Sequence, residues 1–154
     1  MASQKSYSIT LSNNRTEKAA IDYVMAADKT LLNPSRDSRK RILELLELPP
    51  TFARAFDLIQ VPGHVNSEAE ITAADSSSIT LIELKTTQKF LPDSPKGFFF
   101  GATQNEFDLA ERMGRQFRFC FVCLHPDSLG YHLVTLSELN RLIRTKRTQF
   151  QINL

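Results

Sequence analysis

One apolar segment that ends in two charges constrains the fold of this chain more than any other feature. Residues 79–87 read ITLIELKTT, so Glu83 and Lys85 stand one residue apart at the far end of a strand. Successive side chains of a strand point to opposite faces, which places both charges on the face of Ile79 and Leu81. The alternate positions are also mostly apolar, so we expect a strand covered on both faces, where an unpaired charge is costly. A divalent cation bound by the carboxylate and a phosphate facing the ammonium would offset that cost.

A second interpretation of the same pair involves no chemistry. Glu and Lys alternate on many edge strands, where they pair across the ladder and block aggregation. Two features favour a site instead. Apolar residues precede the charges on both faces, and the small hydroxyl side chains of Thr86 and Thr87 suit a strand end that opens on a phosphate cleft.

Length and composition predict one globular domain spanning residues 1–154. Hydrophobic residues make up 42% of the chain and charged residues 23%, with only 5 Gly and 7 Pro, which excludes a large disordered part. No apolar stretch reaches the length of a membrane span, and the N-terminal MASQKSYSIT lacks the hydrophobic segment of a signal peptide. We therefore expect a cytoplasmic protein with no membrane partner.

The cysteines and histidines disfavour several classes of site. Cys120 and Cys123 have CxxC spacing, but alternation places them on opposite faces of an apolar strand, which favours two reduced core cysteines over a zinc or redox pair. His64, His125 and His132 lack metal-ligand spacing. No Gly-rich phosphate loop and no Gly-x-Ser-x-Gly motif occurs, so ATP use and serine hydrolysis have no support.

Charge is distributed unevenly along the chain. Residues 1–110 contain 12 Lys and Arg against 14 Asp and Glu, whereas residues 111–154 contain 7 against 3. An acidic centre with a basic surround suits an enzyme that cleaves phosphodiesters, although ordinary solvated helix faces explain the same excess. The candidates for contacts with a nucleic-acid backbone are Lys89, Arg112, Arg115, Arg144 and Lys146.

The order of predicted elements indicates an α/β fold with a helical N-terminal part at 13–50 and a core at 56–143. Helices are expected at 13–27, 35–48, 103–113 and 136–143, and strands at 56–61, 68–74, 79–86, 117–124 and 131–135, with a possible edge strand at 149–154. A hairpin that feeds a buried strand, followed by a crossover helix and another apolar strand, gives a mixed central sheet with helices on both faces.

The connection at 88–100 is long and contains an aromatic triplet, Phe98, Phe99 and Phe100. Long loops in compact domains are usually functional or mobile. The triplet is consistent with insertion into a groove or stacking on bases, with docking on the protein's own core, and with an oligomer contact.

These motifs resemble a known family over about residues 60–143. An acidic residue before a hydrophobic one, a short turn, a strand ending in Glu-x-Lys, then a helix and an apolar strand resemble the PD-(D/E)xK, or restriction-endonuclease-like, nuclease superfamily. More narrowly, IELKTT, TQNEFDLA and FRFCFVCL are similar to the nuclease-like domains named after the plant protein NO VEIN, which also occur in bacterial defence proteins.

The resemblance implies a site for Mg²⁺, or Mn²⁺, at the end of the strand. Glu83 would be a metal ligand, the backbone carbonyl of Leu84 would complete the coordination, and Lys85 would position or activate the attacking water. The first acidic position is best matched by Glu70, and Glu17 on the first helix resembles the extra acid that some members use.

Several residues compete for these roles. Glu70 departs from the family pattern, because the commoner residue is Asp and a Pro usually precedes it. Glu68 and Asp57 are alternatives, whereas Asp75 reads as a surface turn residue. On the later helix, Gln104 or Glu106 is a candidate polar orienting residue, and Glu106 also has capping-box spacing from Thr103.

The sequence thus leads to the hypothesis of a metal-dependent nuclease that hydrolyses phosphodiester bonds, most readily DNA, in restriction, repair or defence against phage. A homodimer or a subunit of a larger complex is compatible with it. The alternative is a nuclease-fold module that binds nucleic acid or a partner protein without cleaving.

Overall fold

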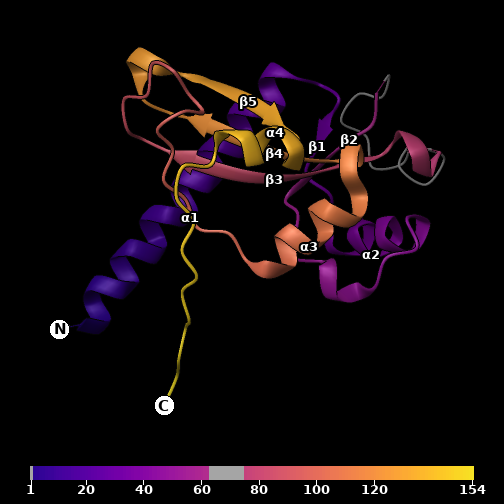
Figure 1. Cartoon of the computed structure of the whole chain (residues 1–154), viewed down its shortest axis with the longest axis horizontal. Helices are drawn as coiled ribbons and strands as arrows, with labels where there is room; N and C mark the ends of the chain where they lie inside the picture. Colours follow the sequence, from indigo (N-terminus) through magenta and orange to yellow (C-terminus); the bar gives the residue numbers. More distant parts are fainter. Residues whose placement is uncertain (1, 63–74) are drawn as a thin grey trace.

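The chain forms a mixed sheet of five strands with helices on both sides (Figure 1). This computed structural model describes residues 2–62 and 75–154, with side chains of the first helix described from Arg15 on. The elements are α1 (Ala2–Ala27), β1 (Leu31–Leu32), α2 (Arg36–Leu45), β2 (Leu58–Gln60), β3 (Thr80–Thr87), α3 (Gln104–Met113), β4 (Phe117–Cys123), β5 (Gly130–Val134) and α4 (Leu136–Leu142). The predicted α/β class is confirmed at this level.

The sheet has the order β1-β2-β3-β4-β5, so the strand with the two charges is the central one. β3 and β4 are parallel, in register from Leu81 opposite Phe117 to Thr87 opposite Cys123, and the other neighbours are antiparallel. The crossover between the parallel strands contains α3, as the helix after the long loop led us to expect.

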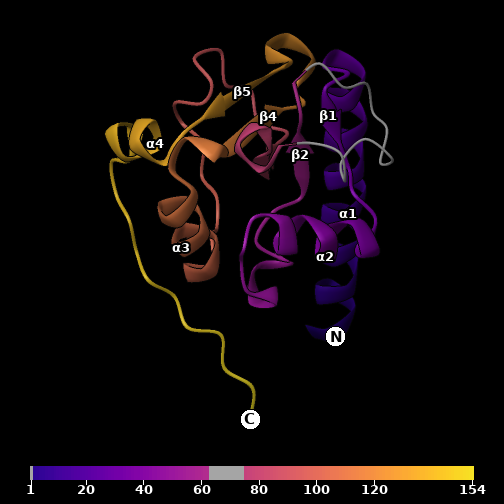
Figure 2. The ribbon, with the colours of Figure 1, turned by 90° about the vertical axis from the view of Figure 1, so that its right-hand side faces the viewer.

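Two hydrophobic layers cover the two faces of β3. On one face, Ile79 and Leu81 pack with side chains from α2, α3 and α4. On the other, Ile82 and Leu84 pack with Ala20 and Val24 of α1. Figure 2 shows α1 on one side of the sheet and α3 and α4 on the other. A strand covered on both faces was the expectation from its apolar pattern, and it is confirmed.

The apolar strand β4 separates its aromatic and sulfur side chains by alternation. Phe117, Phe119 and Phe121 belong to the layer of α3 and α4, and Cys120 to the layer of α1. Both Cys120 and Cys123 are buried and free, as predicted, and burial raises the pKa of the Cys120 thiol to about 12. Within the described part of the chain, no helix is long and apolar enough to cross a membrane.

Some element boundaries differ from the predictions. α1 begins at Ala2 instead of residue 13, consistent with the lack of any Gly or Pro before residue 28. The two-residue β1 was not predicted, because it is too short to show a period. The predicted edge strand at 149–154 is wrong: these residues form no strand, and Phe150 and Ile152 are exposed, so no buried contact stabilises pairing. The predicted strand at 68–74 lies outside the described residues.

Candidate functional site

A pocket of about 310 Å³ opens at the end of β3. Four segments that are distant in sequence line it: α1, the start of β2, the end of β3 and the loop before α3. Its lining residues are Thr16, Glu17, Asp57, Glu83, Leu84, Lys85, Thr86, Phe99, Phe100 and Gly101. The pocket therefore contains both charges of the Glu-x-Lys motif and two of the other acids that the sequence offered.

Glu83 is almost entirely buried, with 8% of its surface exposed. Its Oε1 lies 3.2 Å from the ammonium of Lys85, whereas its Oε2 is buried with no hydrogen-bond partner among the described residues. Burial, followed by the neighbouring acids Glu106 and Asp57, raises the pKa of Glu83 to about 10. An acceptor oxygen beside a polar pocket is thus left without a donor, which is costly unless a ligand binds there.

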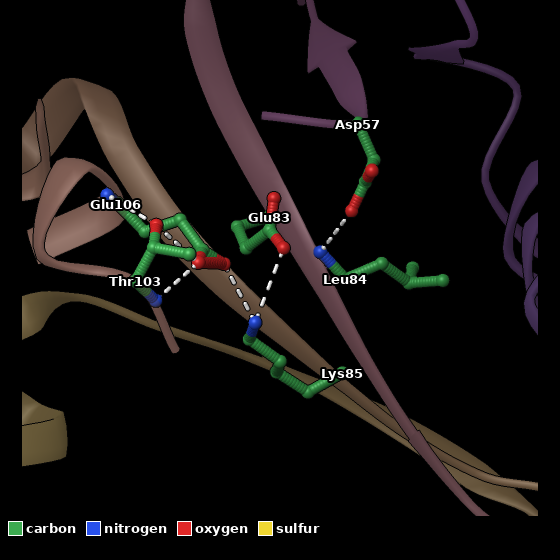
Figure 3. A network of polar contacts seen from close by, with 6 residues as sticks. All are labelled: Asp57, Glu83, Leu84, Lys85, Thr103 and Glu106. Carbon is green, nitrogen blue, oxygen red and sulfur yellow. Dashed lines mark hydrogen bonds and ion pairs between the residues drawn. The ribbon is translucent and has the colours of Figure 1, made fainter. Parts of the chain in front are cut away.

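Lys85 bridges two carboxylates (Figure 3). Its Nζ lies 2.6 Å from Oε1 of Glu106 and 3.2 Å from Oε1 of Glu83. Burial lowers the pKa of Lys85, but the two acids outweigh burial, and the net shift is upward. Lys85 is therefore an ammonium that donates hydrogen bonds, with Glu106 as its closer partner.

Glu106 has a second role besides the predicted capping box. Its Oε2 accepts hydrogen bonds from Thr103 N at 2.6 Å and Thr103 Oγ1 at 2.7 Å, and Glu106 N donates to Thr103 Oγ1 at 3.1 Å. The other oxygen, Oε1, binds Lys85. Burial raises the pKa of Glu106, but Glu83 and the donors Lys85 and Thr103 outweigh it and hold the pKa at about 2. The pKa values of the two acids therefore shift in opposite directions, downward for Glu106 and upward for Glu83.

Asp57, one of the acids left open by the sequence, lies at the pocket because of strand pairing. It directly precedes β2, whose Leu58 is opposite Ile82 of β3. Asp57 N donates to Ile82 O at 2.8 Å, and Asp57 Oδ2 accepts from Leu84 N at 2.8 Å (Figure 3). The carboxylate is thereby fixed beside Leu84 and lowers the acidity of Glu83 through its negative charge.

Arg39 supports the segment that carries Asp57, a role that was not predicted from the sequence. Its guanidinium donates to Asp57 O at 2.7 Å, to Phe56 O and to Ala53 O, and it lies 5.0 Å from the centre of the Phe56 ring. Burial lowers the pKa of Arg39, while Asp57, Glu83 and Glu17 oppose this shift, so the cation is electrostatically coupled to the pocket acids. The sequence signal for a buried role of Arg39 was its spacing: it lies three and four residues before the buried Ile42 and Leu43 and so shares their helix face.

Glu17 of α1 is one of the residues that line the pocket. The residue is exposed, but its pKa is raised, first by burial of the carboxyl group and then by Asp57. The neighbouring Thr16 accepts a hydrogen bond from Gln88 Nε2 at 3.0 Å, which links α1 to the end of β3.

Other predicted site residues lie elsewhere. Gln104 is exposed and donates to Asp108 at 2.9 Å, so it does not line the pocket. Asp75 caps a surface turn by accepting from Ser77 N, as expected. Glu70 and Glu68 lie outside the described residues.

The basic residues predicted to contact nucleic acid do not line the pocket. Lys146 lies 4.4 Å from the centre of the Phe107 ring on α3. The others are exposed on the surface: Lys89, Arg112, Arg115 and Arg144.

The donor set is suited to a hard divalent cation. In residues 2–62 and 75–154, no three His, Cys, Asp or Glu side chains lie close enough together to hold a metal by themselves. Mg²⁺, however, is usually held by one or two carboxylates and keeps several waters. Asp57 and Glu83 line the same pocket and are the two acids that could hold such an ion.

Comparisons of the chain with protein-family models, with curated proteins and with solved structures find no match.

Proposed function

We propose that the protein is a metal-dependent nuclease that hydrolyses phosphodiester bonds in nucleic acid, with DNA as the first substrate to test. One observation carries the proposal: a buried carboxylate with an unpartnered oxygen shares a pocket with a second carboxylate and an ammonium. Two acids and a cation at the end of a covered strand are the groups that metal-assisted phosphoryl chemistry requires.

The residues that would hold the metal are Asp57 and Glu83, with the backbone carbonyl of Leu84 and the side chain of Glu17 as further oxygen donors on the same pocket. Bound Mg²⁺ or Mn²⁺ would polarise the scissile phosphate and stabilise the charge that develops on the leaving oxygen. Glu70 remains a proposed metal ligand that is supported only by the sequence motif.

Lys85 would act as a donor and not as a base. Because two acids raise its pKa, it holds its proton, and an ammonium can orient a water molecule or contact a non-bridging phosphate oxygen. Glu106 would position Lys85 by fixing Nζ from the side of α3, since the contact is 2.6 Å long. Glu106 is therefore a positioning residue in this proposal.

The proposal includes a restriction-endonuclease-like fold. Its support is the order of the central elements: an acid at the start of β2, the Glu-x-Lys motif on the adjacent β3, a crossover helix, and the parallel strand β4. The additional acid on α1, at the same pocket, supports the same assignment.

The test is cleavage of plasmid DNA and of single-stranded RNA by purified protein in Mg²⁺, Mn²⁺ or EDTA. We expect cleavage by the wild type with either metal, none in EDTA, and none by K85A. The matched control is K40A, which removes an exposed lysine of α2 away from the pocket. Absence of cleavage of both polymers in both metals, or equal cleavage by K85A and the wild type, rejects the proposal.

A non-cleaving binding module is the second candidate. It is favoured by the contacts of the Lys85 ammonium, which is already held by Glu106 at 2.6 Å and by Glu83 at 3.2 Å. Binding of nucleic acid that is lost in K85A, with no cleavage in either metal, would identify this function.

A further inference from the structure

Phe99 is the most exposed aromatic side chain beside the pocket, with 92% of its surface accessible. Its neighbours on either side are held in the core: the Phe98 and Phe100 rings lie 4.9 Å and 5.0 Å from the Phe121 ring, both edge to face. The backbone on both sides of Phe99 is therefore fixed by buried contacts. Its exposure results from this anchoring and places a large apolar ring beside the charged groups of the pocket, Glu83 and Lys85.

The surroundings of Phe99 restrict what can bind its face. The pocket is small, at about 310 Å³, and besides Phe99 its lining combines three acids, one lysine and two threonines with Leu84, Phe100 and Gly101. A ligand that fills it must combine a polar, charged part with a flat apolar part a short distance away. A phosphodiester with its attached base has this combination, and base stacking on an aromatic ring is tolerant of sequence.

We propose that Phe99 is a stacking platform for an unpaired base of the strand whose phosphate lies in the pocket, which makes single-stranded segments and frayed ends the preferred substrates. This inference rests on the proposed nuclease function and names its substrate class. Bases inside a duplex are already stacked on both faces, so a rim aromatic can reach a free face only where pairing is interrupted. Exposed Lys96, on the same loop, supplies a cation for the adjacent backbone.

The test separates binding from cleavage. A short single-stranded oligonucleotide carrying 2-aminopurine is titrated with wild type, F99A, F99L and F99Y, with Ca²⁺ in place of Mg²⁺ and separately in EDTA, and its integrity is checked afterwards. We expect quenching of 2-aminopurine by the wild type and F99Y, loss of quenching in F99A and F99L, and a loss of affinity in F99A of about 5- to 150-fold. A blunt duplex of the same sequence should bind F99A and wild type alike.

The matched control is F90A. Phe90 is 54% exposed and contacts the His125 ring at 5.3 Å, but it does not line the pocket. We expect F90A to bind the single strand like the wild type. Because Phe99 is so exposed, F99A should unfold at the wild-type temperature, which thermal unfolding verifies.

The outcomes distinguish this inference from the proposed function. Quenching and affinity that depend on Phe99, without cleavage in Mg²⁺ or Mn²⁺, support the stacking platform and reject hydrolysis. Metal-dependent cleavage with an unchanged KM in F99A rejects the platform alone. A loss of duplex binding equal to the loss of single-strand binding identifies a wedge between base pairs, and a wild-type dimer that becomes monomeric in F99A identifies an oligomer contact. Either result overturns the inference.

Discussion

At the scale of single residues, the site depends on side chains that each serve two neighbours. Glu106 caps α3 through one oxygen and holds Lys85 through the other. The capping box is visible in the sequence, because it is a local pattern of two residues. The contact with Lys85 is not visible in the sequence, because it joins a strand and a helix that only the folded structure brings together.

Replacement of Glu106 by Gln should lower cleavage about 10- to 100-fold with little loss of stability. Gln retains a capping side chain at this position, but it removes the charge, so Lys85 is left with Glu83 as its only acidic partner and moves away from the phosphate. Single-turnover cleavage at saturating metal measures the effect. The control is E138Q, which changes an exposed Glu in the equivalent position of α4. Unchanged cleavage in E106Q would show that Lys85 is positioned by Glu83 alone.

Replacement of Arg39 by Ala should reduce the free energy of unfolding by about 2 kcal/mol, because it removes the guanidinium that donates hydrogen bonds to three backbone carbonyls. Metal affinity should fall as well, since the carbonyl of Asp57 is one of the three. Urea unfolding and metal titration measure the two effects. R36A, which removes an exposed arginine from the first turn of the same helix, should change neither. A normal metal affinity in R39A would restrict Arg39 to a role in stability.

At the scale of elements, α3 contributes to the site through the contacts of its first turn. Thr103 Oγ1 accepts from Glu106 N and donates to Glu106 Oε2. Thr135 makes the same pair of contacts with Glu138 at the start of α4, where both residues are away from the pocket. The two helices thus share these two contacts, while α3 also has the bond from Thr103 N to Glu106 Oε2 and the pocket beside it.

T103A and T135A should each destabilise the protein by about 1 kcal/mol, because each loses an N-cap. Only T103A should also lower cleavage, since it removes two restraints on Glu106 and thereby on Lys85. Thermal unfolding and initial rates of plasmid cleavage, measured on both variants, test this difference. Equal rates in T103A and T135A would contradict the link between the cap and Lys85.

The sequence predicted the elements with strong local signals. The capping box located α3, and the continuous apolar run located β4. It did not predict β1, which is defined by pairing with β2, or the beginning of α1. For the site, alternation along β3 placed Glu83 and Lys85 on one face, as the structure has them. The contacts of Arg39 and of Glu106 with distant residues depend on the fold, and the sequence indicated only that Arg39 shares a helix face with Ile42 and Leu43.

At the scale of the whole molecule, the pocket brings together α1, β2, β3 and the loop before α3. Bringing several acids together in this pocket destabilises the folded state, because in the unfolded chain each carboxyl group is solvated. Burial raises the pKa of Glu83 from an ordinary 4.5 to about 10, which predicts that at neutral pH the folded protein holds a proton that the unfolded chain has released. Glu106 has the opposite shift, to about 2, and its contribution changes only in acid, below pH 4.5.

The metal-free protein should therefore become less stable as the pH rises from 5.5 to 8. The contribution of Glu83 is fully present below its unfolded pKa and is lost as the pH rises towards its folded pKa, with a slope of at most about 1.4 kcal/mol per pH unit. E83Q cannot ionise, so its free energy of unfolding should vary less over this range. Urea unfolding in EDTA at several pH values measures both slopes, with E111Q as a control at an exposed site of α3. If the free energy of unfolding changes equally with pH in E83Q and in the wild type, Glu83 is already ionised in the folded protein. The metal-free site then holds no proton on Glu83.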